Sequence, residues 1–104
     1  MERFSNVKQP NLEMLQKGYS LKGRWNRDFF KNSNPLVLEL GCGMGEYSVG
    51  LAERYPEKNF LGIDIKGARM WQGASIAIEK KLKNVGFLRV RIDWIENCFS
   101  KNEV

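Results

Sequence analysis

The sequence contains no histidine and only two cysteines among its 104 residues. Histidine is the commonest general base and the commonest protein ligand of metals, so its absence argues against a zinc site and against a histidine-dependent catalytic triad. Cys42 and Cys98 do not form a CxxC pair, and two cysteines do not make a disulfide framework. We therefore expect a metal-free, cytoplasmic protein.

Long hydrophobic runs are also absent, because the purely apolar stretches are only a few residues long. This excludes a transmembrane helix, and the N-terminus lacks the charged-then-apolar pattern of a signal peptide. A hydrophobic content of 42% is ordinary for a folded protein. A chain of this length predicts one small domain at most.

The net charge of +5 is concentrated at the N-terminus. Residues 1–34 contain seven Lys and Arg against three acidic residues, whereas residues 35–104 contain ten against nine. We therefore divide the chain into a basic N-terminal arm, 1–34, and a balanced domain, 35–104. A basic arm is typical of proteins that contact a polyanion, although a mildly basic solvated tail has the same composition.

The hydrophobic pattern after residue 34 predicts alternating strands and helices. Strands are expected at 36–40, 59–64 and 87–92, helices at 46–55 and 67–83, and a short helical piece at 95–99. Strands joined by helices pair in parallel through right-handed crossovers. This order predicts an α/β fold, the first half of a Rossmann-like sheet with about three strands. The sequence reads as truncated, and an exposed flank of the first strand favours self-association.

The sequence also predicts local features at residues 20–26 and in the helix expected at 46–55. Residues 20–26 are expected to form a loop with basic and aromatic side chains, because glycines and a proline interrupt the first 34 residues. In the first predicted helix, Tyr47, Leu51 and Tyr55 are four residues apart and fall on one face.

The segment 39–46, with the sequence Glu-Leu-Gly-Cys-Gly-Met-Gly-Glu, lies between the first strand and the first helix. Gly41, Gly43 and Gly45 alternate here, and glycine permits backbone angles and close ligand contacts that other residues prevent. The helix that follows points unpaired N–H groups at such a ligand. Asp64 ends the second strand about 20 residues later, the spacing at which an acid accepts hydrogen bonds from ribose hydroxyls. The segment predicts a nucleoside-cofactor site.

The identity of the cofactor depends on position 46. A dinucleotide-binding turn has the pattern GxGxxG, and its third glycine would replace Glu46. An acid at this helix start repels a pyrophosphate, whereas S-adenosylmethionine (SAM) has no phosphate and carries cationic sulfonium and ammonium groups. The pattern therefore favours SAM over a nicotinamide dinucleotide. A purely structural glycine turn is the remaining alternative.

Further residues are assigned to the same cofactor site. Asp93 follows the third strand and is expected to accept a hydrogen bond from the adenine amino group, with the backbone N–H of Trp94 nearby. Ile65, next to Asp64, is assigned to the site as well. Glu39 is half-buried at a strand end and needs partners. It either binds the methionyl ammonium group or accepts hydrogen bonds from the N–H groups of the glycine turn.

Three segments resemble the bacterial tRNA (guanine-N7)-methyltransferases. They are Leu-Glu-Leu-Gly-Cys-Gly-Met-Gly-Glu-Tyr at 38–47, Leu-Gly-Ile-Asp-Ile-Lys-Gly-Ala-Arg-Met-Trp at 61–71, and Leu-Lys-Gly-Arg-Trp-Asn at 21–26 followed by two phenylalanines at 29–30. The resemblance implies a class I SAM-dependent enzyme that methylates N7 of a variable-loop guanine in tRNA. Glu39, Asp64 and Asp93 match the cofactor-binding acids of that family. At position 94 the family often has alanine, and this chain has Trp94.

The resemblance also implies limits on this chain. The family's further acid, which meets both cofactor and guanine, and most of its tRNA-facing residues would lie beyond Val104. We therefore expect no catalytic residue in this fragment and no methyl transfer by the fragment alone. Guanine N7 carries a lone pair and no proton, so the reaction needs no general base and proceeds by positioning and water exclusion.

Four basic residues of the N-terminal arm are expected to contact the tRNA backbone: Lys17, Lys22, Arg24 and Arg27. Two other functions are compatible with the sequence. One is a SAM-dependent methyltransferase of the same fold that acts on a small molecule or a protein. The other is a non-catalytic RNA-binding module in which the glycine turn is structural.

Overall fold

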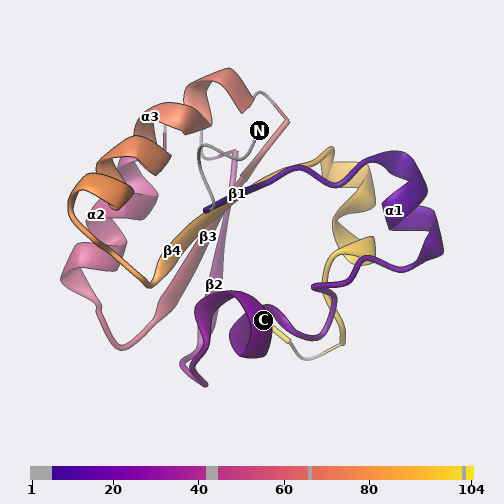
Figure 1. Ribbon diagram of the computed structural model, residues 1–104, viewed down its shortest axis with the longest axis horizontal. Helices are drawn as coiled ribbons and strands as arrows, with labels where there is room; N and C mark the ends of the chain where they lie inside the picture. The colour runs from indigo at the N-terminus through magenta and orange to yellow at the C-terminus, as the bar shows by residue number, and fades with distance from the viewer. Residues whose placement is uncertain (1–5, 42–44, 66, 102) are drawn as a thin grey trace.

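The computed structural model describes residues 6–41, 45–65, 67–101 and 103–104. Its elements form one parallel sheet with helical segments on both faces (Figure 1). In chain order they are β1 (Val7–Lys8), α1 (Leu12–Lys17), the π-helix η1 (Trp25–Phe30), β2 (Leu36–Leu40), α2 (Glu46–Arg54), β3 (Asn59–Asp64), α3 (Gly67–Glu79), β4 (Val85–Arg89) and the 3₁₀-helix η2 (Ile92–Asn97).

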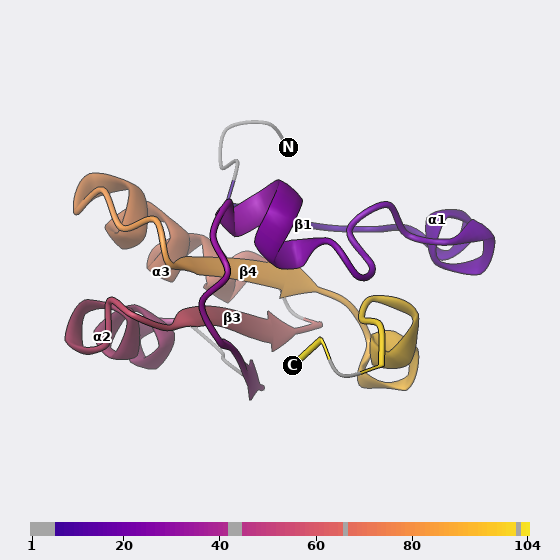
Figure 2. The same ribbon diagram turned by 90° about the horizontal axis from the view of Figure 1, so that it is seen from below.

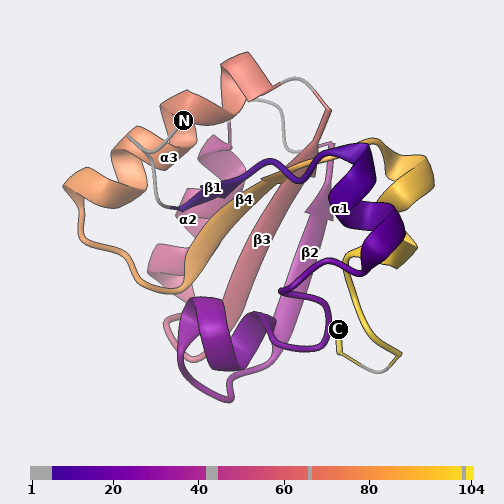
Figure 3. The ribbon, with the colours of Figure 1, turned by 45° about the vertical axis from the view of Figure 1, so that its right-hand side comes forward.

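The sheet has the strand order β1-β4-β3-β2, and all of its pairings are parallel (Figure 3). The predicted parallel α/β fold is therefore confirmed. The expectation of three strands was wrong by one, because Val7 pairs with Phe87 and adds β1 as a fourth strand. A strand of two residues is too short to produce a detectable alternation. β2 lies at the sheet edge as expected, and self-association through that edge stays a prediction.

The boundaries of β4 and α3 differ from those predicted. β4 begins at Val85 rather than at residue 87, because Gly86 is part of the strand and not a turn. A Cβ at Gly86 would lie 2.5 Å from the Phe29 ring, so glycine is needed where η1 packs on the sheet. α3 ends at Glu79, and Lys81 follows with φ 58°, a left-handed conformation that stops the helix before residue 83.

α2 and α3 cover one face of the sheet (Figure 2). Of the residues expected on one face of α2, Tyr47 is 66% exposed and does not pack on the sheet, whereas Leu51 is partly buried. The buried residues of α2 are instead Ser48, Val49 and Ala52. The apolar cluster on this side joins Val49 and Ala52 to side chains from all of β1, β3, β4 and α3: Val7, Phe60, Met70, Ala74, Ala77, Val85 and Phe87.

The opposite face is covered by η1, α1 and η2, with Trp25 at the centre of the packing. Trp25 is fully buried, and its Nε1–H donates a hydrogen bond of 2.8 Å to the Cys98 carbonyl. Its ring stacks on Phe99 at 5.5 Å and meets Tyr19 and Phe29 edge-on. The prediction of a loop over 20–26 was therefore wrong for its last two residues, because η1 begins at Trp25. Much of the predicted N-terminal arm is packed onto the sheet.

Candidate functional site

Four predicted site residues lie together at the carboxyl edge of the sheet. Gly41 follows β2, Asp64 ends β3, Ile65 comes next, and Asp93 lies in η2 after β4. They surround a hollow of about 240 Å³, together with Arg91. Parallel strands end at the same edge, so three segments far apart in the sequence meet there. Gly43 lies outside the described residues.

Asp64 is the partly buried acid at the end of β3. Its Oδ1 accepts a hydrogen bond of 2.7 Å from the backbone N–H of Ile65. The neighbouring strand end is fixed by a bond of 2.7 Å from the Gly41 N–H to the Ile63 carbonyl. The backbone around this carboxylate is thus held in place, and an oriented carboxylate can accept hydrogen bonds from paired hydroxyl groups.

Asp93 forms an ion pair that the sequence did not predict. Its Oδ2 accepts a hydrogen bond of 3.1 Å from Nη2 of Arg91, and the two side chains are 66% and 64% exposed. Exposed pairs of this kind are weak, so Arg91 can exchange its partner for a ligand group. The sequence signal for this ion pair was the position of Arg91, two residues before Asp93.

Glu39 is held by Ser48, a residue that the sequence pattern did not assign to the site. The Oγ–H of Ser48 donates a hydrogen bond of 2.7 Å to Oε1 of Glu39, and Ser48 is fully buried. The helix α2 therefore orients the carboxylate of β2. The alternative in which Glu39 accepts from the glycine turn falls on residues 42–44, outside the described residues. The sequence signal for this contact was a serine on the buried face of α2, where a hydroxyl group needs a hydrogen-bond partner.

Gly45 begins α2 in a left-handed conformation, with φ 81°. A Cβ on this residue would lie 2.6 Å from the Phe87 ring and 3.3 Å from the Cα of Gly73. Gly45 is thus pressed against β4 and α3. Glycine is required here both for the backbone angle and for the close approach.

We expect Gly45→Ala to lower the free energy of unfolding by about 2–4 kcal/mol, because it combines an unfavourable backbone angle with overpacking. Gly50→Ala is the matched control, since Gly50 lies inside α2 with open space around its Cβ position. That control should raise stability by about 0.5–1 kcal/mol. Urea unfolding measures both changes. Equal stability of Gly45→Ala and the unchanged chain would contradict the packing described for Gly45.

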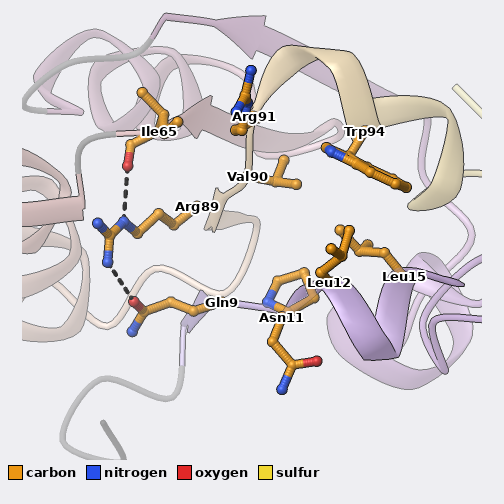
Figure 4. Close-up of a pocket in the computed structure, with 10 residues that line it drawn as sticks. Gln9, Asn11, Leu12, Leu15, Ile65, Arg89, Val90, Arg91 and Trp94 are labelled. Carbon is orange, nitrogen blue, oxygen red and sulfur yellow. Dashed lines mark hydrogen bonds between the residues drawn. The ribbon is translucent and has the colours of Figure 1, made fainter.

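A larger hollow of about 620 Å³ lies beside the first (Figure 4). Ile65 and Arg91 line both hollows. Trp94, which was assigned to the cofactor site, lines the larger one, as do Arg89 and Val90. Five of the predicted cofactor residues thus line two adjoining hollows at one end of the sheet, whereas Glu39 and Gly45 line neither of them.

Two of the predicted tRNA contacts are engaged in ion pairs. Lys17 lies 3.1 Å from Glu13 within α1. Arg27 lies 2.9 Å from Asp28, and the hydrogen bond from its guanidinium lowers the pKa of the Asp28 carboxyl below its usual value. Arg27 lies in η1, whose Asn26 accepts a hydrogen bond of 2.8 Å from the side-chain amide of Asn59, the first residue of β3. Arg27 therefore lies at the amino end of the sheet, opposite the candidate cofactor site.

Lys22 and Arg24 lie in a turn that is anchored by Glu103. The carboxylate of Glu103 accepts hydrogen bonds from the backbone N–H groups of Gly23, at 2.8 Å, and Trp25, at 3.0 Å. Within the ranges that the structure describes, no carboxylate lies in ion-pair distance of Lys22 or Arg24. In this respect they differ from Lys17 and Arg27, which are both paired with an acid.

The described part of the chain has no helix long and apolar enough to cross a membrane. Across the same ranges, no three His, Cys, Asp or Glu side chains are grouped as a metal site would require. Burial raises the pKa of the Cys98 thiol to about 11, so this cysteine stays protonated at neutral pH and is a poor nucleophile.

Comparison with known proteins matches residues 33–104 to a family described as "Putative methyltransferase". The chain is 57% identical over 104 residues to a tRNA (guanine-N(7)-)-methyltransferase of Christiangramia forsetii, covering 99% of this chain and 46% of the relative. It is 53% identical over 107 residues to the protein of the same name from Porphyromonas gingivalis, covering 100% of this chain and 44% of the relative. The chain thus spans less than half the length of these relatives.

A solved structure with a similar fold is PKMT2 from Rickettsia typhi. The TM-score is 0.50 at 30% sequence identity, over 55% of this chain and 11% of the other. The similarity supports the partial Rossmann-like fold described above.

Proposed function

The chain belongs to this methyltransferase family, and from that premise we propose that the carboxyl edge of its sheet binds SAM. The observation that carries the proposal is the meeting of Gly41, Asp64 and Asp93 around one hollow. The acceptors present fit the ligand, because two carboxylates line the hollow and SAM is rich in hydroxyl and amino donors. Bound SAM would supply an electrophilic methyl group on its sulfonium.

Each residue has a distinct part in holding the cofactor. Asp64 accepts hydrogen bonds from the ribose hydroxyls, and Asp93 accepts one from the adenine amino group once Arg91 releases that oxygen. Glu39, oriented by Ser48, attracts the methionyl ammonium group. These are binding and positioning roles, so no residue of this chain is assigned a proton transfer.

The substrate we propose is a guanine in the variable loop of tRNA, methylated at N7 by the full-length protein in the cytoplasm. Two relatives that are more than half identical to this chain carry the name tRNA (guanine-N(7)-)-methyltransferase. The absence of histidine is compatible with this chemistry, since N7 has a free lone pair and requires no general base. The 104-residue chain alone should bind cofactor without transferring methyl groups.

Methyl transfer tests this proposal. The full-length protein is incubated with radiolabelled SAM and unmodified tRNA, and the labelled nucleotide is identified after digestion. We expect N7-methylguanosine from the variable loop and no label on protein or small molecules. Label confined to a protein or a small molecule would support a methyltransferase of the same fold with a different substrate. Binding of tRNA without any methyl transfer would support a non-catalytic RNA-binding module.

Binding to tRNA should depend on the turn that carries Lys22 and Arg24. Replacing both with alanine removes about two phosphate contacts, so we expect the slope of log affinity against log salt to fall by about 2. Filter binding at several salt concentrations measures this slope. Lys81→Ala with Lys83→Ala, which removes two exposed cations from the α3–β4 connection, is the charge-matched control and should leave the slope unchanged. Equal slopes for the two double variants would contradict the assignment.

A further inference from the structure

The larger hollow at the carboxyl edge is walled on one side by the N-terminal segment 9–15 (Figure 4). This segment lies outside residues 33–104, the part of the chain that matches the methyltransferase family. Leu12 and Leu15 of α1 contribute to the wall, and Val90 and Trp94 line the hollow with them. The lining therefore combines the N-terminal segment with the end of β4 and with η2. β4 is the neighbour of β3, the strand that Asp64 ends.

The apolar and polar groups of the hollow suit a flat heteroaromatic ring. Leu12, Val90 and Trp94 offer apolar surface for the faces of a ring, and Arg91 brings a guanidinium group that can stack on it. Polar side chains stand at the rim, among them Gln9. A purine has this combination of apolar faces and a polar edge.

The N-terminal wall is attached to the candidate cofactor site by Arg89. Its Nε–H donates a hydrogen bond of 2.8 Å to the Ile65 carbonyl, and its Nη1 donates one of 3.2 Å to Oε1 of Gln9. Figure 4 shows Arg89 between these two partners. Ile65 belongs to both hollows, so the same arginine holds the N-terminal segment at the passage between them.

The order of the strands gives the direction of a bound nucleoside. Asp64 ends β3, the next strand in the sheet is β4, and the one after it is β1. A ribose bound at Asp64 with its methionyl part toward β2 therefore directs its base over the end of β4. The larger hollow lies there, between the end of β4 and α1.

We propose that residues 9–15 form a wall of the adenine pocket, with Leu12 in contact with the base. This inference rests on the proposed binding of SAM and adds to it a segment that precedes residues 33–104. The adenine ring lies in the larger hollow with its amino edge turned toward Asp93, which is bonded to Arg91 where the hollows join, and the ribose lies in the smaller hollow. Ile65 and Arg91 stand where the two hollows join.

Leu12 and Met14 provide a matched test on one helix. Leu12 is 52% exposed and lines the hollow, whereas Met14 is 45% exposed and does not. Both are exposed, so substitution by serine should leave the core intact and cost each variant similar helix propensity. Titration calorimetry with S-adenosylhomocysteine and with adenosine measures affinity, and thermal melts without ligand check folding.

We expect Leu12→Ser to weaken both ligands by about tenfold, because a buried apolar contact with the base is lost. Met14→Ser should bind both ligands like the unchanged chain. Unaltered affinity of Leu12→Ser, or an equal loss in Met14→Ser, would overturn the adenine wall while leaving SAM binding intact. If the unchanged chain bound neither ligand, the proposed cofactor site and this wall would both be rejected.

Discussion

Trp25→Ala is expected to lower the free energy of unfolding by about 3–5 kcal/mol, a large share of the stability of a domain this small. The side chain is fully buried, and its Nε1–H is bonded to the Cys98 carbonyl. Removing it leaves a cavity among Tyr19, Phe29 and Phe99 and an unpaired buried carbonyl. Equilibrium urea unfolding, followed by far-UV circular dichroism, measures the loss.

Two controls separate packing from the loss of an aromatic residue as such. Tyr47→Ala removes a ring that is 66% exposed and should change stability by less than about 0.5 kcal/mol. Trp25→Phe retains a ring but loses the bond to Cys98, so its stability should lie between those of the alanine variant and the unchanged chain. A Trp25→Ala protein as stable as Tyr47→Ala would show that η1 does not pack as described.

Asp64→Asn is expected to weaken S-adenosylhomocysteine binding by about 100-fold or more, since charge-assisted hydrogen bonds to two ribose hydroxyls are lost. The substitution keeps an oxygen that can accept the hydrogen bond from the Ile65 N–H. The fold should therefore survive, and a thermal melt without ligand checks this. Titration calorimetry gives the affinity.

Glu57→Gln is the control for this substitution, because Glu57 is an exposed acid near the amino end of β3, at the other end of the strand from Asp64. It removes the same charge and should leave the affinity unchanged. If Asp64→Asn bound the ligand as tightly as Glu57→Gln, the ribose would not lie at the end of β3.

The parallel sheet could be predicted because its strands and helices leave strong local signals. The predicted bounds of β2 and β3 agree with the structure, since both are largely apolar runs, and β2 is followed by Gly41 while β3 ends at Asp64. The meeting of Gly41, Asp64 and Asp93 then follows from parallel pairing, which brings the carboxyl ends of the strands to one edge. That these residues bind a cofactor stays a prediction.

The features that were missed depend on contacts between distant segments. β1 has two residues and exists because Val7 pairs with Phe87, so no local pattern marks it. The local pattern predicts a loop at Trp25, because the burial of this side chain depends on Cys98 and Phe99 at the other end of the chain. Ser48 bonds Glu39 only after α2 packs against β2. Tertiary packing decides such positions, and local sequence does not record it.

A thermal melt of the chain with S-adenosylhomocysteine, and separately with NAD, tests the central claim most directly. A ligand that binds only the folded state adds about 2.7 kcal/mol of stability at a concentration 100 times its Kd. The melting temperature of a domain of this size should therefore rise by roughly 10 °C or more with S-adenosylhomocysteine. NAD should cause no shift, because Glu46 occupies the position where a pyrophosphate-binding turn has glycine. A shift with NAD, or no shift with S-adenosylhomocysteine, would contradict a SAM site at the carboxyl edge of this sheet.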